Sequence, residues 1–99
     1  MFIMIDKVTS EKLDQYFSIT AEALKKAGGA LDTTRLKEAT DFLDMAQRYF
    51  DDARYFVDTK KDRVLAFAAL NYAHGWLDAG ARIGLFKVKD SRLFTVDSD

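Results

Sequence analysis

The residues best suited to chemistry in this sequence lie on one predicted helix, at about residues 63–83. His74 is the only histidine of the chain, and Asp78 follows it by four residues. Residues four apart share a helix face, so these side chains could form an acid–base couple or supply two metal ligands. Helical zinc and di-iron sites need more ligands, in motifs such as His-Glu-x-x-His or Glu-x-x-His, and the sequence holds neither. No catalytic residue, metal ligand or cofactor is therefore assigned.

A polar stripe surrounds this pair. On a helical wheel its members point within about 60° of a common direction. They are Asn71, His74, Gly75, Asp78 and Arg82. An exposed glycine gains nothing from a core, so Gly75 indicates that something packs on the stripe, unless the stripe is a plain solvent face. Asp78 and Arg82, also four apart, are expected to form a surface ion pair. The stripe is the candidate docking surface.

The opposite face of this helix has the pattern of a core. Its members are Leu65, Ala66, Ala69, Ala73, Trp76, Leu77, Gly80 and Gly84. An interior glycine costs about 1 kcal/mol relative to alanine, so Gly80 requires the close approach of a neighbouring backbone. Gly84 is expected to end the helix. We assign Trp76, Gly80, Tyr72 and Phe50 to core packing.

Two further helices must position this one. The first is expected over about residues 10–27, with Thr9 or Ser10 as its cap and a glycine stop at Gly28 and Gly29. Its apolar face repeats at helical spacing through Leu13, Phe17, Thr20, Leu24 and Ala27.

The second helix is expected over about residues 33–58, capped by Asp32 or a following threonine, and Asp62 can cap the third. Phe42, Tyr49 and Phe56 widen its apolar stripe until it can meet two neighbours. The sequence thus predicts a single all-α domain over residues 1–99. It is a three-helix up-down-up bundle with a short apolar N-terminal arm and an extended C-terminal tail at 85–99.

Both ends carry apolar residues that no helix covers. The run from Met1 to Ile5 is too short for a signal peptide or a membrane span, and we expect it to pack on the body. The repeats "LFKV" and "LFTV" in the tail fit a hairpin or an extended segment docked on the bundle. Such apolar surface often marks an interface. Two outcomes stay open: a homodimer in which arms and third helix meet their own copies, or arms folded back on one bundle.

The composition makes some classes of partner and some cellular locations less expected. The net charge is −1, whereas domains devoted to phosphate backbones are clearly basic, so nucleic acid is not the expected partner. The chain has no cysteine, which favours the cytoplasm over a secreted, disulfide-linked fold. No membrane association is expected.

Residues 51–86, "DDARYFVDTKKDRVLAFAALNYAHGWLDAGARIGLF", resemble an archaeal family known as domain of unknown function 357. The matching motifs are the segment from Tyr49 to Phe56 and a later set formed by Tyr72, Ala73, Gly75, Asp78 and Ala79. The resemblance implies an archaeal, cytoplasmic three-helix bundle. It brings no activity, so no catalytic residue can be carried over.

The expected function is a non-catalytic protein-interaction module, whose unnamed partner docks on the polar stripe and nearby aromatic residues. The alternative is a small enzyme or ligand binder centred on His74 and Asp78. A cavity lined by these two residues, with His74 facing inward, would favour the alternative.

Overall fold

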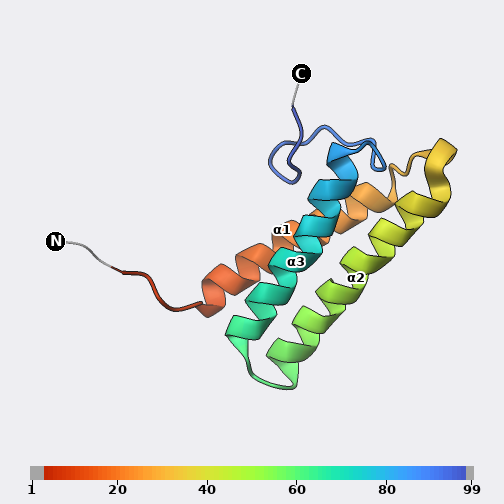
Figure 1. Cartoon of the computed structure of the whole chain (residues 1–99). Helices are drawn as coiled ribbons and strands as arrows, with labels where there is room; N and C mark the ends of the chain where they lie inside the picture. The colour runs from red at the N-terminus through yellow and green to blue at the C-terminus, as the bar shows by residue number, and fades with distance from the viewer. Residues whose placement is uncertain (1–3, 98–99) are drawn as a thin grey trace.

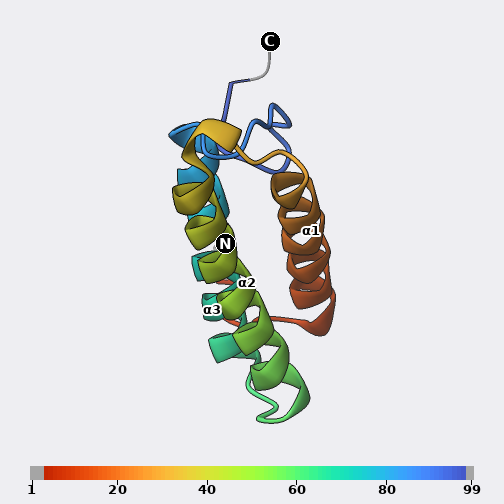
Figure 2. The same ribbon diagram turned by 90° about the vertical axis from the view of Figure 1, so that its right-hand side faces the viewer.

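The fold is a bundle of three α-helices, seen in a computed structural model that describes residues 4–97 (Figure 1). The elements are α1 (Ser10–Gly28), a short 3-10 turn η1 (Thr33–Arg35), α2 (Leu36–Asp58) and α3 (Arg63–Arg82). The chain runs up, down and up, as predicted, and the helix boundaries agree within three residues. Helices α2 and α3 form a hairpin, and α1 packs on one side of it only (Figure 2). Within residues 4–97, no helix covers the other side of the hairpin.

Helices α1 and α3 and the turn η1 each begin after a residue that was predicted to cap a helix, whereas α2 follows η1 without a side-chain cap. The Thr9 hydroxyl accepts a hydrogen bond from the backbone N–H of Lys12 at 3.1 Å. Asp32 accepts from Thr34 at 2.9 Å at the start of η1, and Asp62 accepts from Leu65 at 2.9 Å at the start of α3. These bonds satisfy backbone N–H groups that the first turn of a helix leaves unpaired.

Short side chains bring the helices together. The five residues predicted for the inner face of α1 are all buried. Helix α2 buries an alanine every seven residues, at Ala39, Ala46 and Ala53. The buried residues of α3 are Ala66, Ala69, Leu70, Ala73, Leu77, Gly80 and Ala81. With so few bulky residues between them, the axes of α2 and α3 can approach closely.

The predicted core face of α3 was rotated from the real one. Leu65 is exposed, Trp76 is only partly buried and Tyr72 is 54% exposed, so the assignment of Tyr72 to the core was wrong. The buried face is centred instead on Leu70 and Leu77. The cause is α1, which packs against α3 and draws the core towards that side.

The C-terminal tail, residues 85–97, closes the pole where α1 ends and α2 begins (Figure 1). Gly84 ends α3 with a positive φ of 79°, as its predicted role requires. Beyond it, Phe86 forms one antiparallel bridge with Leu31, and Lys87 donates its backbone N–H to Ala30. The docked tail is confirmed and the hairpin is wrong, since residues 85–97 contain no strand.

The apolar residues of this tail are covered by its own bundle. Leu85, Phe86, Leu93 and Phe94 are buried. Gly80 is also buried, and a Cβ placed there would lie only 2.8 Å from Cδ2 of Phe86. The close approach predicted at Gly80 is therefore confirmed, but it is made by an aromatic ring and not by a backbone. The expectation that the tail leaves its apolar residues uncovered was wrong.

The described part of the N-terminal arm, Met4 and Ile5, does not pack on the body. Met4 is 83% exposed and Ile5 is 81% exposed, so the expected contact was wrong for these residues. Val8 is the residue that reaches the core, beside Leu13. Helix α1 begins at Ser10, at the end of the bundle, and residues 4–7 before it are exposed (Figure 1). The rest of the predicted arm, residues 1–3, lies outside the described residues, as do residues 98–99.

Candidate functional site

The predicted docking stripe on α3 is divided between two surroundings. His74 and Asp78 face the C-terminal tail and are partly buried. Gly75, Asn71 and Arg82 are exposed on the neighbouring side of the helix. The five residues thus do not form one surface.

His74 joins three parts of the fold. Its Nε2 donates to the carbonyl oxygen of Leu93 in the tail. Its Nδ1 lies 3.1 Å from the hydroxyl oxygen of Thr20 on α1. A carbonyl oxygen can only accept, so in the neutral imidazole Nδ1 accepts from the Thr20 hydroxyl. This contact supplies the partner that the buried Thr20 needs.

Asp78 continues this connection. Its Oδ1 accepts from the backbone N–H of Thr95 at 2.9 Å and lies 3.8 Å from Nε2 of His74. The carboxylate therefore holds the tail, and the ion pair expected with Arg82 is not among the contacts within residues 4–97. His74 faces inward, as the ligand-site alternative required, but its neighbours are protein groups.

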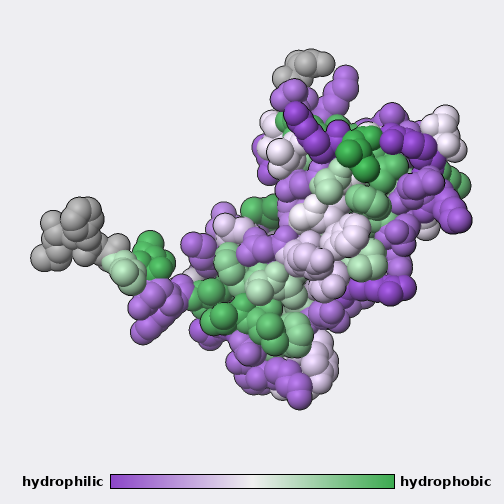
Figure 3. Space-filling view, in the orientation of Figure 1, coloured by the Kyte–Doolittle hydropathy of each residue, from purple (hydrophilic) through white to green (hydrophobic). Residues whose placement is uncertain are grey.

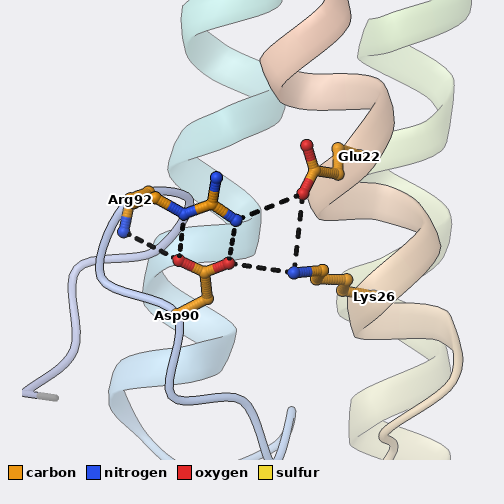
Figure 4. A network of polar contacts seen from close by, with 4 residues as sticks. All are labelled: Glu22, Lys26, Asp90 and Arg92. Atoms are coloured by element: carbon orange, nitrogen blue, oxygen red, sulfur yellow. Dashed lines mark hydrogen bonds and ion pairs between the residues drawn. The ribbon is translucent and has the colours of Figure 1, made fainter.

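Ion pairs fasten the same tail to α1. The Asp90 carboxylate binds Lys26 at 2.9 Å and Arg92 at 2.6 Å (Figure 4). Glu22 completes the ring, 3.5 Å from Lys26 and 3.6 Å from Arg92. Hydrogen bonds from Arg92 and then from Lys26 hold the pKa of Asp90 far below its usual range. The pKa of Lys26 is raised in return, first by its hydrogen bond to Asp90.

Asp32 makes similar polar contacts where the loop after α1 meets the end of α3. Hydrogen bonds from the hydroxyl and backbone N–H of Thr34, followed by that of Arg35, keep the pKa of Asp32 far below normal. Arg35 also donates to the carbonyl oxygen of Ile83 at 2.9 Å, beyond the end of α3. The contacts of Asp32 and Asp90 thus join the loop after α1, the end of α3 and the tail at this pole.

The open side of the α2–α3 hairpin has a different character. It contains an aromatic groove of about 360 Å³, lined by Phe42, Asn71, Tyr72, Gly75, Trp76 and Ala79. The ring of Trp76 packs edge-on against Phe42 with centroids 5.0 Å apart, and Tyr72 packs in the same way on Tyr49 at 4.4 Å. No atom lies within 4 Å of a Cβ placed at Gly75. The glycine therefore leaves a hollow between two large rings.

The apolar surface extends beyond the groove. Along α3, exposed apolar residues recur at three- and four-residue spacing. They are Leu65, Ala68, Tyr72, Gly75, Ala79 and Ile83. Figure 3 looks onto this side of the hairpin, where green and pale side chains run along its length between purple edges. We call it the open face. The stripe prediction missed its apolar members because α3 is apolar on nearly every side.

Two larger hollows have other linings. One, of about 830 Å³, lies between the N-terminal segment and the α2–α3 loop, and the other, of about 960 Å³, lies along the first turns of α2. Most of the residues that line these two hollows are charged or polar, among them Asp6, Lys61 and Asp41. The aromatic groove exposes a larger apolar share than either hollow, so it is the stronger candidate for a contact surface.

The four residues assigned to core packing lie in different surroundings. Gly80 is buried against Phe86, and Phe50 is partly buried, with its ring packed edge-on against Phe17 at 5.6 Å. Trp76 and Tyr72 line the groove instead. Within residues 4–97, no cluster of three or more His, Cys, Asp or Glu residues is placed to hold a metal ion. No helix in that range is long and apolar enough to cross a membrane.

Fold and site together define a class: a small three-helix domain whose own tail closes one pole and whose hairpin presents an open apolar face. The family model described as "Protein of unknown function (DUF357)" matches residues 15–86. The chain therefore belongs to the DUF357 family, as the resemblance indicated. No match was found among curated proteins or among solved structures.

Proposed function

We propose that this protein is a non-catalytic interaction module that docks a protein partner on the open face of α2 and α3. The observation that supports the proposal is that α3 has polar side chains on its covered side and apolar side chains on its uncovered side. The side covered by the tail presents His74 and Asp78, whereas the uncovered side presents Tyr72, Gly75 and Ala79. Apolar surface left open beside a covered polar surface favours an interface, because burying it releases the water that it orders.

The proposal moves the expected docking surface by about one quarter-turn of the helix. Asn71, Gly75 and Arg82 stay in it, at the edges of the aromatic groove or beside it. His74 and Asp78 leave it, because the tail occupies their polar atoms. The alternative ligand site centred on these two residues gains no support from those contacts. We also place the module in the cytoplasm, a setting that its cysteine-free composition favours.

Site-specific photo-crosslinking in the native cell tests the proposal. A photoreactive residue replaces Asn71 at the edge of the groove, and in a control chain it replaces Tyr55, which is similarly exposed on the outer side of α2. We expect an adduct from position 71 that disappears when Tyr72→Glu places a charge in the groove. No adduct from position 71, or equal adducts from positions 71 and 55, would overturn the proposal.

A further inference from the structure

We infer that the partner on the open face is a second copy of this chain, packed with its α3 antiparallel to the first α3 about a two-fold axis. The inference rests on the proposed function and names its partner. Four features of the open face carry it: the order of large and small residues, their polar groups, the size of the face and its charge.

The order of residue sizes on α3 is self-complementary. Consider a two-fold axis that passes between residues 73 and 74. It places each residue opposite the residue of the partner for which the two residue numbers add up to 147. It sets the ring of Tyr72 opposite the hollow at Gly75 in the partner, and sets Ala68 opposite the partner's Ala79. Both of these pairs contain at least one small residue, so the backbones can approach closely where these pairs meet. Since the symmetry repeats every pair, each ring meets a hollow.

Polar groups match under the same operation. Asn71 and Trp76 are opposed, and they bring an amide oxygen that accepts and an indole N–H that donates. The Asn71 amide nitrogen already donates to the carbonyl oxygen of Phe67 at 3.1 Å, which fixes the orientation of its side chain. The pairing therefore leaves a donor facing an acceptor at the edge of the interface.

The open face is large enough for a stable dimer. A helix of 20 residues such as α3 spans about 30 Å. Two helices packed about 10 Å apart present a face roughly 20 Å wide, so each copy offers about 600 Å². The pair would bury about 1,200 Å², the lower limit of specific and stable interfaces.

Charge supports the same arrangement. On α3, Arg82 is the charged residue beside the open face. The exposed strip of α2 that holds Asp41 and Asp52 also holds Arg48, but Arg48 is already paired with Asp44. Placing α3 of one copy over the hairpin of the other brings a cation to an acidic edge. The net charge of −1 opposes association only weakly.

Sedimentation velocity of the intact chain over a range of concentrations tests the inference. We expect a concentration-dependent shift from a species of 11.3 kDa to one of about twice that mass. Tyr72→Glu should sediment as a single chain, with a helical circular dichroism spectrum like that of the wild type. The matched control Tyr55→Glu should still dimerise, because Tyr55 is 48% exposed but lies outside the open face.

A second variant separates dimerisation from folding. Gly75→Leu fills the hollow that would accept the partner's Tyr72, and it also raises helix propensity. We expect a well-folded single chain. A dimer that survives both Tyr72→Glu and Gly75→Leu would overturn the inference, as would a wild-type chain that stays single at high micromolar concentration.

The crosslinking mass distinguishes this inference from the function on which it rests. An adduct of two chains from position 71 supports both. An adduct of another mass, together with a wild-type chain that stays single, overturns the self-association and leaves the interaction module standing.

Discussion

Two sides of α3 lie a third of a turn apart and differ in how their side chains are covered. On the tail side, His74 and Asp78 hold backbone groups of Leu93 and Thr95, so polar atoms are satisfied within one chain. On the open face, Tyr72 and the hollow at Gly75 lie in a groove that the chain leaves uncovered. The comparison teaches that His74 and Asp78 help to hold the fold together, whereas residues 4–97 leave the apolar residues of the open face uncovered.

Substitutions at Gly75 and Gly80, the two glycines of α3, test this difference between the two sides most strongly. Gly80→Leu drives a side chain into the buried ring of Phe86, and we expect loss of the cooperatively folded state, because overpacking costs about 1–3 kcal/mol or more. Gly75→Leu points into open space, and it should raise the free energy of unfolding by up to about 1 kcal/mol at dilutions where the chain is single. Urea denaturation followed by circular dichroism measures both. Similar losses for both variants would mean that the two sides are equally packed.

Two aromatic truncations sharpen the contrast. Phe86 is 1% exposed at the closed pole, and Phe86→Ala should cost about 3–5 kcal/mol of unfolding free energy. Trp76 lies partly buried in the groove, so in a single chain Trp76→Ala should cost only about 1–2 kcal/mol. The core assignment of Trp76 from the sequence had implied the larger loss. Equal costs in urea denaturation at high dilution would restore that assignment.

The sequence predicted those parts of the fold in which polar and apolar residues alternate clearly. In α1, the buried positions from Leu13 to Ala27 were identified individually, because exposed charges such as Glu11 and Lys25 mark the other side. The caps at Thr9, Asp32 and Asp62 were predicted for a similar reason, since each precedes a helix whose first N–H groups need an acceptor.

The candidate site was harder to predict, because α3 lacks such a contrast. Leu65 is as apolar as the buried Leu70, and Tyr72 is a large aromatic residue of a kind also found in cores, so the helical wheel could not tell a core face from an open face. The role of His74 depends on Leu93, 19 residues away, and on Thr20, 54 residues away. No periodicity within one helix encodes contacts of that separation, and only the docked tail shows that His74 and Asp78 are structural.

Replacing His74 tests whether the tail side is held as a unit. In His74→Ala, the Leu93 carbonyl loses its donor and the buried hydroxyl of Thr20 loses its partner. We expect a loss of about 1–3 kcal/mol, the cost of leaving such groups unpaired. Amide hydrogen exchange should accelerate at residues 93–96 and stay unchanged in the middle of α2. Unchanged exchange in the tail would show that its apolar residues alone hold it.

Acid should loosen the closed pole before the helices unfold. The folded-state pKa of Asp90 is lowered by the hydrogen bonds from Arg92 and Lys26, so its contribution to stability is complete above the unfolded carboxyl value of about 4. It is lost as pH falls from there towards the folded pKa, because the unfolded chain binds the proton more readily. The melting temperature should thus be flat from neutral pH to about pH 5 and then fall.

The variant Asp90→Asn tests this origin of the acid sensitivity. Its melting temperature at neutral pH should be slightly lower and the fall in acid shallower, because one carboxyl group with a lowered pKa is gone while Asp32 remains. High salt should reduce the difference between the two chains, as the ion pairs of Lys26 and Arg92 are exposed to solvent. If the two acid profiles coincide, the tail is held by Phe86, Leu93 and Phe94 and not by its charges.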